Sequence, residues 1–301
     1  MKRQELERET RRIFHKIHTS QGNAPEIFNR LTSLLSCDYL EVKKDFFKNK
    51  VCLDAGCGSN ANATFSMLKM GAKKVYAFDL DKTILKSVPK FLHGFEGRYD
   101  LGTGNVLNMD YPDNFFDFVL CVGVLHHTAN AMQGLKELAR VTKKNGVLHI
   151  TIQGKGGLVK EITDFLRDKY TKDIQFKKII DGLEEKHFLR LWEWMSKIME
   201  EQGDLIAGKI SPAIIKELFN KDLVLTIKDR ITAPTYDRYT EKEIKGWLED
   251  NGFIKIKRLT RYPDIKNIRR FLCPFYYEFD NEFSRMLYGD GQIQIKATKA
   301  V

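Results

Sequence analysis

The chain has 301 residues, of which 43% are hydrophobic and 30% are charged, so it is long enough to bury a substantial core. This composition excludes a disordered chain, a collagen-like repeat and a small fold held together by disulfides. The net charge of +10 bears on binding partners rather than on fold. Part of the basic excess lies in residues 255–270, which predict either a solvated face or a surface for an anionic substrate or a nucleic acid.

Cysteine usage and the start of the chain indicate a cytoplasmic protein. The five cysteines are Cys37, Cys52, Cys57, Cys121 and Cys273. None of them has the C-x-x-C spacing of a zinc or redox site, so we expect reduced, mostly buried thiols and no bound metal. The first twelve residues are highly charged, unlike a signal peptide. The longest apolar run, residues 118–125, is far below the roughly 20 residues that cross a bilayer, so we expect no membrane association.

Strand and helix patterns alternate along the first half of the chain. An amphipathic helix is expected within the first twenty residues, as part of a cap over residues 1–46. A short apolar strand ends at Asp54, and a second ends at Asp79, with Asp81 as the expected N-cap of the next helix. The expected strands cover residues 51–54, 74–78, 97–104, 116–122 and 147–152, and the expected helices cover 61–70 and 129–142, with a turn at 144–146.

This alternation predicts a doubly wound, Rossmann-like α/β fold with a seven-stranded, mainly parallel sheet. A helix at 241–250 and alternating patterns near 254–257 and 293–298 predict an antiparallel edge strand. Residues 155–239 have helical periodicity and predict an insertion after strand five, at the sheet edge where such folds bind ligands. We expect a lid hinged at Gly154, Gly156 and Gly157, above a core formed by residues 47–154 and 240–301.

A glycine turn follows the first strand. Gly56 and Gly58 lie where the strand must turn into a helix, which lets backbone N–H groups approach a ligand. The turn also fits the dinucleotide pattern G-x-G-x-x-G/A, and Asp79 lies at a suitable distance along the chain to bind ribose hydroxyls. At this point a nicotinamide-dependent oxidoreductase and a turn without any ligand both remain open.

Two longer segments are more specific. GNVLNMDYPDNFFDFVLCVGVLHH (104–127) and KELARVTKKNGV (136–147) resemble the class I S-adenosylmethionine-dependent methyltransferases of the small-molecule, UbiE-like (type 11) branch. The resemblance covers residues 51–152 closely and the terminal helix and strands more loosely. It implies S-adenosylmethionine as cofactor and methyl transfer to an oxygen or nitrogen atom of a small molecule, which the basic charge suggests is anionic.

The resemblance also implies which residues surround the cofactor. By position they are Asp54, Ala55, Gly56 and Gly58 at the methionine portion, Asp79 at the ribose, Leu80, Asn105 and Val106 at the adenine, and Cys121 nearby. Two positions depart from the family pattern. Asn60 replaces a third glycine, but asparagine tolerates a positive φ. Asn105 replaces an aspartate, yet its carbonyl oxygen can still accept a hydrogen bond from the adenine amino group.

The pair His126-His127 follows strand four, on the loop that faces the transferred methyl group in this family. His127 is the first candidate and His126 the second for a base that takes a proton from a hydroxyl or phenol acceptor. An amine or thiolate acceptor would need no base, because positioning alone supplies much of the acceleration. A structural role for both histidines is the alternative. Tyr236, Arg238 and Tyr239, where the insertion rejoins the core, are candidate substrate contacts or packing residues.

Three other functions remain to be compared. An RNA methyltransferase is favoured by the basic stretch, but Cys121-Val-Gly-Val stands where base-methylating enzymes carry an Asn-Pro-Pro-aromatic or Asp-Pro-Pro-aromatic motif. A nicotinamide oxidoreductase is disfavoured by the strand-four segment. A non-catalytic relative is disfavoured because most of the cofactor positions are filled. The sequence therefore favours a small molecule over a specific nucleic acid, and it does not indicate an oligomeric state.

Overall fold

A computed structural model describes residues 3–21, 28, 32, 35–201, 221–259 and 282–301. Cys273 and the part of the basic stretch that begins at Arg261 lie outside these residues. The four other cysteines are buried and unpaired. Among the described helices, none combines the length and the apolar character that crossing a membrane requires.

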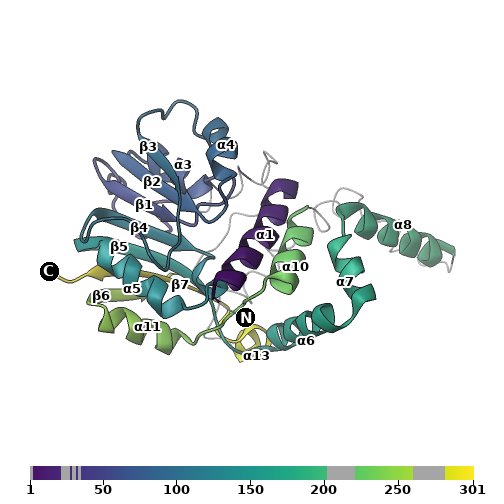
Figure 1. Cartoon of the computed structure of the whole chain (residues 1–301). Helices are drawn as coiled ribbons and strands as arrows, with labels where there is room; N and C mark the ends of the chain where they lie inside the picture. Colours follow the sequence, from purple (N-terminus) through teal and green to yellow (C-terminus); the bar gives the residue numbers. More distant parts are fainter. Residues whose placement is uncertain (1–2, 22–27, 29–31, 33–34, 202–220, 260–281) are drawn as a thin grey trace.

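A single seven-stranded sheet forms the centre of the fold (Figure 1). Its strands are β1 (Val51–Ala55), β2 (Lys74–Asp79), β3 (Tyr99–Thr103), β4 (Phe116–Val122), β5 (Thr142–Gln153), β6 (Phe253–Arg258) and β7 (Gln292–Lys299). They lie in the order β3-β2-β1-β4-β5-β7-β6. The neighbouring pairs from β3 to β5 are parallel, and β7 pairs antiparallel with both β5 and β6. The predicted fold class is confirmed, and the antiparallel strand lies between β5 and β6.

Helices cover both faces of this sheet. The helices are α1 (Arg3–Gln21), α3 (Asn62–Lys69), α4 (Ile84–Ser87), α5 (Ala131–Val141), α6 (Leu158–Lys172), α7 (Ile174–Asp181), α8 (Glu185–Glu201), α10 (Lys221–Thr232), α11 (Glu241–Asp250) and α13 (Glu282–Tyr288), with 3-10 turns η1 (Pro89–Phe91) and η2 (Leu125–His127). Met67 of α3 and Ile84 of α4 belong to one core cluster, and Leu135 of α5 and Leu248 of α11 belong to the other. The sheet is therefore doubly wound, with a core on each face.

Strand β4 shows why the pattern gives this architecture. Phe118 packs in the cluster beneath α3, while Val119 packs in the cluster beneath α5. A parallel strand buried on both faces has a nearly continuous apolar sequence. Phe118 also makes an edge contact with Phe47, with ring centroids 5.0 Å apart, which ties the segment before β1 to the centre of the sheet.

Two local predictions were wrong. The helix expected from Asp81 begins at Ile84 and is only four residues long. The Asp81 carboxylate does accept from the backbone N–H of Thr83 (3.0 Å), as an N-cap would, and it also lies 2.7 Å from Nδ1 of His15. The turn expected at 144–146 lies inside β5. There Asn145 adopts φ 61°, and an irregular register lets Thr142 still pair with Phe116.

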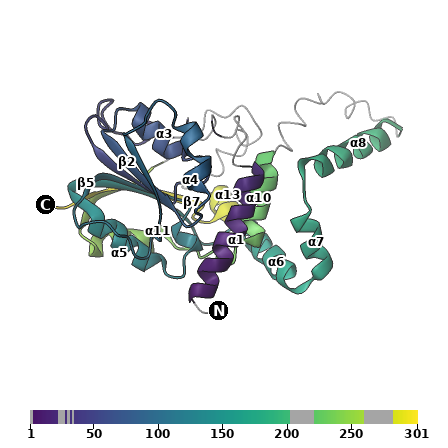
Figure 2. The same ribbon diagram turned by 45° about the horizontal axis from the view of Figure 1, so that its top comes forward.

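The insertion after β5 is helical, as predicted. Figures 1 and 2 show α6, α7 and α8 leading away from the sheet, whereas α10 returns alongside α1. Helix α6 packs against α10, α7 and α13. Residues 202–220 lie outside the described part of the chain. The role of this insertion as a lid stays a prediction.

The base of the insertion differs from the expected hinge. The backbone N–H of Gly154 donates to the carbonyl of Gly291 (2.8 Å), and that of Asp290 donates to the carbonyl of Lys155 (2.8 Å). Gly157 has φ 86°, and a Cβ added there would lie 2.3 Å from the backbone nitrogen of Gly289. These glycines therefore allow two backbone segments to pack closely, which restrains the base of the insertion.

A pair of glycine substitutions tests this close packing. We expect Gly157→Ala to lower the free energy of unfolding by at least about 2 kcal/mol, because it adds a steric clash to an unfavourable φ. Gly246→Ala, in the middle of α11 with open space around it, should raise that free energy by about 0.5–1 kcal/mol. Urea denaturation followed by circular dichroism measures both. Equal effects of the two substitutions would contradict the assignment.

Candidate active site

The glycine turn and the histidine loop meet at the carboxyl ends of β1 and β4. Gly56 adopts φ 83°, and its backbone N–H donates to the carbonyl of Phe78 (2.9 Å). A Cβ added at Gly56 would lie 2.3 Å from Cγ2 of Val124, two residues before His126. Only glycine combines this φ with so close an approach. The sequence-predicted turn and histidine pair are thus brought to one edge of the sheet.

Asp54 lies beneath the turn and is only 2% exposed. Its Oδ2 accepts from the backbone N–H (3.0 Å) and the hydroxyl (2.7 Å) of Thr64, in the first turn of α3. Burial raises the pKa of Asp54 to about 6, and the Thr64 hydrogen bonds oppose this shift. Its carboxylate thereby anchors the start of α3, where the N-cap residue Ala61 has no capping side chain. Direct contact with a cofactor stays a prediction.

The left-handed residue in this turn is not the one expected. Ala61 has φ 44°, while Asn60 is absent from the positive-φ residues. Ala61 occupies the N-cap position of α3. The residue with positive φ is therefore Ala61, one position after Asn60, where we had expected it. Asn60 is instead buried in the turn.

The nucleoside candidates follow β2 and β3. Each oxygen of the half-buried Asp79 carboxylate accepts one backbone N–H, from Gly58 and Asp81, at 3.0 Å, and the partly exposed Leu80 follows it. Oδ1 of Asn105 accepts from the N–H of Leu107 (2.9 Å). A carboxylate offers about four lone-pair directions, and an amide oxygen offers two. Asp79 and Asn105 can therefore still accept from ribose hydroxyls and an adenine amino group.

The two remaining cofactor candidates are buried in the core. Val106 and Cys121 both belong to the cluster beneath α5. Burial raises the pKa of the Cys121 thiol well above its usual range, so the thiol is inert at neutral pH. A cofactor contact at either residue would involve the backbone.

Helix α1 lies over this edge and contacts several of the candidate residues. Nδ2 of Asn105 donates to Oε1 of Glu7 (2.9 Å), and His15 lies against Asp81. The ring of Phe14 contacts the ring of His127, with centroids 4.8 Å apart. Figure 2 shows α1 beside α10, between the sheet and the helices of the insertion. The amphipathic pattern predicted the helix, but no local signal identified its partners.

His127 is held by hydrogen bonds from the segment after α10. Its Nδ1 lies 2.9 Å from the carbonyl oxygen of Thr235, and the Thr235 hydroxyl donates to the carbonyl of His127. A neutral ring must donate from Nδ1 to this carbonyl, which leaves the Nε2 lone pair free. Nε2 lies 3.8 Å from Oδ1 of Asp229. Burial lowers the pKa of His127 from 6.5, although Asp229 and the Thr235 carbonyl oppose the shift.

His126 occupies a different environment. It is buried, and its Nδ1 has no hydrogen-bond partner among the described residues. Burial, followed by the charges of His127 and Lys160, lowers its pKa well below 6.5. Its carbonyl accepts from the N–H of Asp237 (2.9 Å). Of the two histidines, His127 has the better geometry for a base, because its ring is oriented and has a carboxylate nearby.

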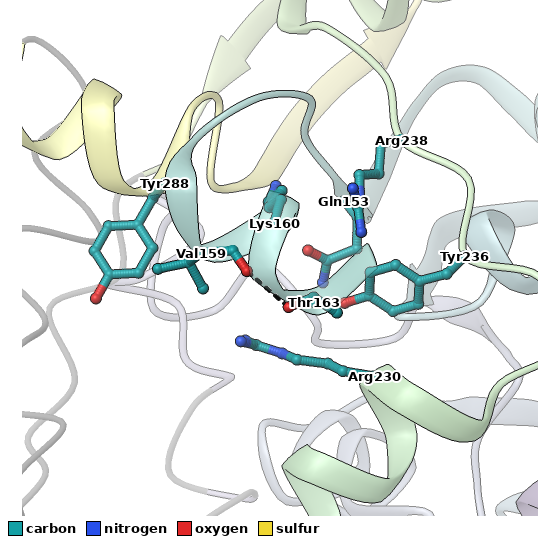
Figure 3. A pocket seen from close by; sticks show the side chains of 8 residues that line it. All are labelled: Gln153, Val159, Lys160, Thr163, Arg230, Tyr236, Arg238 and Tyr288. Atoms are coloured by element: carbon teal, nitrogen blue, oxygen red, sulfur yellow. Dashed lines mark hydrogen bonds between the residues drawn. The ribbon is translucent and has the colours of Figure 1, made fainter. Parts of the chain in front are cut away.

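Two of the three substrate candidates line a pocket beside the histidines. The pocket is lined by Gln153, Val159, Lys160, Thr163, Arg230, Tyr236, Arg238 and Tyr288 (Figure 3). The ring centroid of Tyr236 lies 5.3 Å from that of His127 and 5.4 Å from that of His126. Tyr239 instead packs on Trp247 at 4.9 Å and is not among the lining residues. Among described residues, no cluster of three or more potential ligands could hold a metal ion.

Residues 53–150 match the family model of a methyltransferase domain, Methyltransf_11. This match and the fold show that the chain carries a class I, Rossmann-like methyltransferase domain. Over its full length the chain is similar in fold to the 1,6-didemethyltoxoflavin-N1-methyltransferase of Burkholderia thailandensis, with a TM-score of 0.53 and 14% identity, covering 100% of this chain and 92% of that one. At that level of identity, the likeness concerns the fold alone.

Sequence relatives cover only part of the chain. The uncharacterized protein MJ0638 of Methanocaldococcus jannaschii is 33% identical over 135 residues, which are 45% of this chain and 52% of that protein. A demethylmenaquinone methyltransferase of Geobacillus stearothermophilus is 30% identical over 143 residues (44% and 60%). A tRNA U34 carboxymethyltransferase of Helicobacter pylori is 34% identical over 106 residues (34% and 40%). The chain thus spans about half the length of these curated relatives.

The protonation state of His127 can be measured directly. We expect ring-nitrogen NMR to show a neutral ring at neutral pH with the proton on Nδ1, and a titration midpoint below 6.5. Asp229→Asn should lower the midpoint further, because the carboxylate favours the charged ring. Asp173→Asn, at the N-cap of α7, removes the same charge away from the ring and should leave the midpoint unchanged. A proton on Nε2 alone would rule out the proposed orientation.

Proposed function

We propose that this chain transfers a methyl group from S-adenosylmethionine to an oxygen or nitrogen atom of a small molecule. The observation that carries the proposal is the contact between the glycine turn and the histidine loop, at Gly56 and Val124. A donor bound at the turn and an acceptor bound at His127 would be neighbours. In-line displacement requires this proximity of the two reacting groups.

The residues present suit the cofactor. The glycines at 56 and 58 would let its amino-acid portion approach the backbone closely, while their own N–H groups stay bonded to Phe78 and Asp79. Asp79 would accept from its ribose hydroxyls, and Asn105 would face its adenine. When bound, the cofactor supplies a methyl group on a positively charged sulfur, already activated for displacement. We further propose that residues 1–46 and the insertion 155–239 cover this edge of the core, since α1 and the segment after α10 both contact His127.

His127 would act on the acceptor. With Nδ1 donating to Thr235, the neutral Nε2 can take a proton from a hydroxyl or phenol as its oxygen attacks the methyl group. The carboxylate of Asp229, 3.8 Å away, would stabilise the charged ring that results. An amine acceptor would rely on positioning alone. The burial of His127 beneath Phe14 and Tyr236 would keep competing water from the reaction.

Calorimetry tests the cofactor proposal. We expect S-adenosylmethionine and S-adenosylhomocysteine to bind, and Asp79→Ala to weaken binding at least tenfold, about 1.4 kcal/mol, because a charged acceptor of two hydroxyls is lost. Asp100→Ala removes the same charge from β3, where Asp100 pairs with Lys74, and should change affinity less than about twofold. Tight binding of NADH without any response to S-adenosylhomocysteine would instead favour an oxidoreductase.

An RNA methyltransferase is the second candidate, and the similarity to the tRNA carboxymethyltransferase favours it. That similarity spans about a third of the chain. It therefore supports a methyltransferase domain more than it supports RNA as the acceptor. Within the described part of the basic stretch, Lys257 pairs with Glu41, and Arg258 pairs with Glu241. These acidic partners reduce the charge available to phosphates. The observations therefore favour a small-molecule acceptor.

Salt dependence distinguishes the two acceptors. We expect total tRNA to bind weakly, with affinity falling steeply as KCl rises and lost near physiological ionic strength, as for non-specific phosphate contacts. Fluorescence anisotropy with labelled tRNA measures this, with single-stranded DNA of equal length as the comparison. Nanomolar binding that tolerates salt and is selective for one RNA would instead identify RNA as the methyl acceptor.

A further inference from the structure

The pocket beside the histidines is built from segments far apart in the sequence. Gln153 ends β5, Lys160 lies in the first turn of α6, and Arg230 lies near the end of α10. Tyr288 ends α13, and Tyr236 comes from the strand-like segment after α10. Figure 3 shows Gln153 and Tyr236 close together, with Arg230 reaching in from α10 beneath Thr163, while the ring of Tyr288 points away from them. Tyr236 also contacts both histidine rings. The same side chain therefore lines the pocket and packs against His127, the candidate catalytic residue.

The lining is cationic. It includes Lys160, Arg230 and Arg238 and no carboxylate. Arg238 is paired with Asp164, through contacts of 2.5 and 2.6 Å, and the Asp164 side chain is 57% exposed. That carboxylate lies toward solvent and compensates the charge of Arg238.

Lys160 is the most unusual of these residues, because it is only 8% exposed. Its Nζ donates to the carbonyl oxygens of Gly154 and Gly291, the latter at 2.9 Å. Both acceptors are neutral, and a buried ammonium without a counter-charge is costly. A neutral side-chain amide could donate the same two hydrogen bonds and link the end of β5 to the turn before β7. These two hydrogen bonds therefore do not explain why a charged side chain is buried here.

The charges around Lys160 add to this cost. The groups that face it are Arg238, Arg230 and Arg258, which disfavour its charge, and Asp290, which favours it. Together with burial, which is the largest cause, they lower the pKa of Lys160 to about 7. Arg258 comes from β6 and is paired with Glu241, and Asp290 comes from the turn before β7, so the charges that act on Lys160 come from several elements.

We propose that this pocket binds an oxyanion of the methyl acceptor, a carboxylate or a phosphate, through Lys160 and Arg230. Tyr236 then separates the bound anion from His127 and sets the distance between the anionic group and the atom that is methylated. This inference rests on the proposed function for its choice of ligand. It goes beyond that function by assigning the acceptor a negative charge and a site.

Small aromatic probes test the site in the full-length chain. Fluorine NMR titrations would use para-fluorobenzoate and para-fluorophenyl phosphate as the two oxyanions, with neutral para-fluorobenzamide for comparison. S-adenosylhomocysteine is added first, so that its own carboxylate subsite is filled, and its binding is measured separately by calorimetry. We expect at least one oxyanion to bind saturably, at least about tenfold more tightly than the amide. The stronger of the two identifies the acceptor as a carboxylate or a phosphate.

Two variants and one control locate the binding. Lys160→Met keeps the length of the side chain without its charge, and Arg230→Gln tests the site independently should the first variant fold poorly. Each should weaken oxyanion binding at least about tenfold, since a charge-assisted hydrogen bond is lost. Lys155→Met removes a nearby exposed lysine that pairs with Glu243 outside the pocket and should change affinity less than about twofold.

The pH dependence gives a second readout. Affinity of the wild-type chain for para-fluorobenzoate should fall as pH rises above about 7, because Lys160 loses its proton while the arginines stay charged. Lys160→Met should remove this dependence. Equal binding of benzoate and benzamide, or equal effects of all three substitutions, would overturn the oxyanion site while leaving the methyltransferase proposal intact. If S-adenosylhomocysteine does not bind, that result would instead contradict the proposed methyltransferase function.

Discussion

The close approach of Gly56 to Val124 is the constraint on which the rest of the site depends. It fixes the turn after β1 against the loop after β4, at the point where the strand order reverses from β2-β1 to β4-β5. Open α/β sheets bind ligands at such a reversal. The buried carboxylate of Asp54 supports the same turn from below through Thr64. The cofactor edge and the histidine loop therefore pack directly against each other, and the end of the insertion adds hydrogen bonds to the histidine loop through Thr235 and Asp237.

The insertion and α1 complete what the sheet leaves open. Residue Thr235, in the segment after α10, orients the ring of His127, while Phe14 of α1 packs against the same ring. The base of the insertion is restrained by close backbone packing at Gly154 and Gly157. A cover attached in this way can hold a histidine in one tautomer. It also creates the cationic pocket, because Lys160 lies where that base meets the turn before β7.

Sequence patterns predicted the sheet, the glycine turn and the histidine pair, because each depends on local spacing or on a run of similar residues. They did not predict that α4 is only four residues long, nor that the Asp81 carboxylate also bonds to His15 of α1, which is distant in the sequence. Nor did they place the left-handed residue at Ala61. Lys160 resembles any other lysine on an amphipathic helix, and its burial among arginines arises only when four distant segments meet. Such contacts have no local signature, so the pocket could not be predicted from the sequence.

The position of α1 has a consequence for the kinetics of ligand exchange. The helix is bonded through Glu7 to Asn105, the adenine candidate, and through His15 to Asp81, two residues after the ribose candidate Asp79. A molecule bound beneath these contacts could leave only after they break. Dissociation would then be timed by the opening of the N-terminal helix rather than by diffusion from an open groove. A substitution at Glu7 or His15 would then alter residence time without changing a proposed catalytic group.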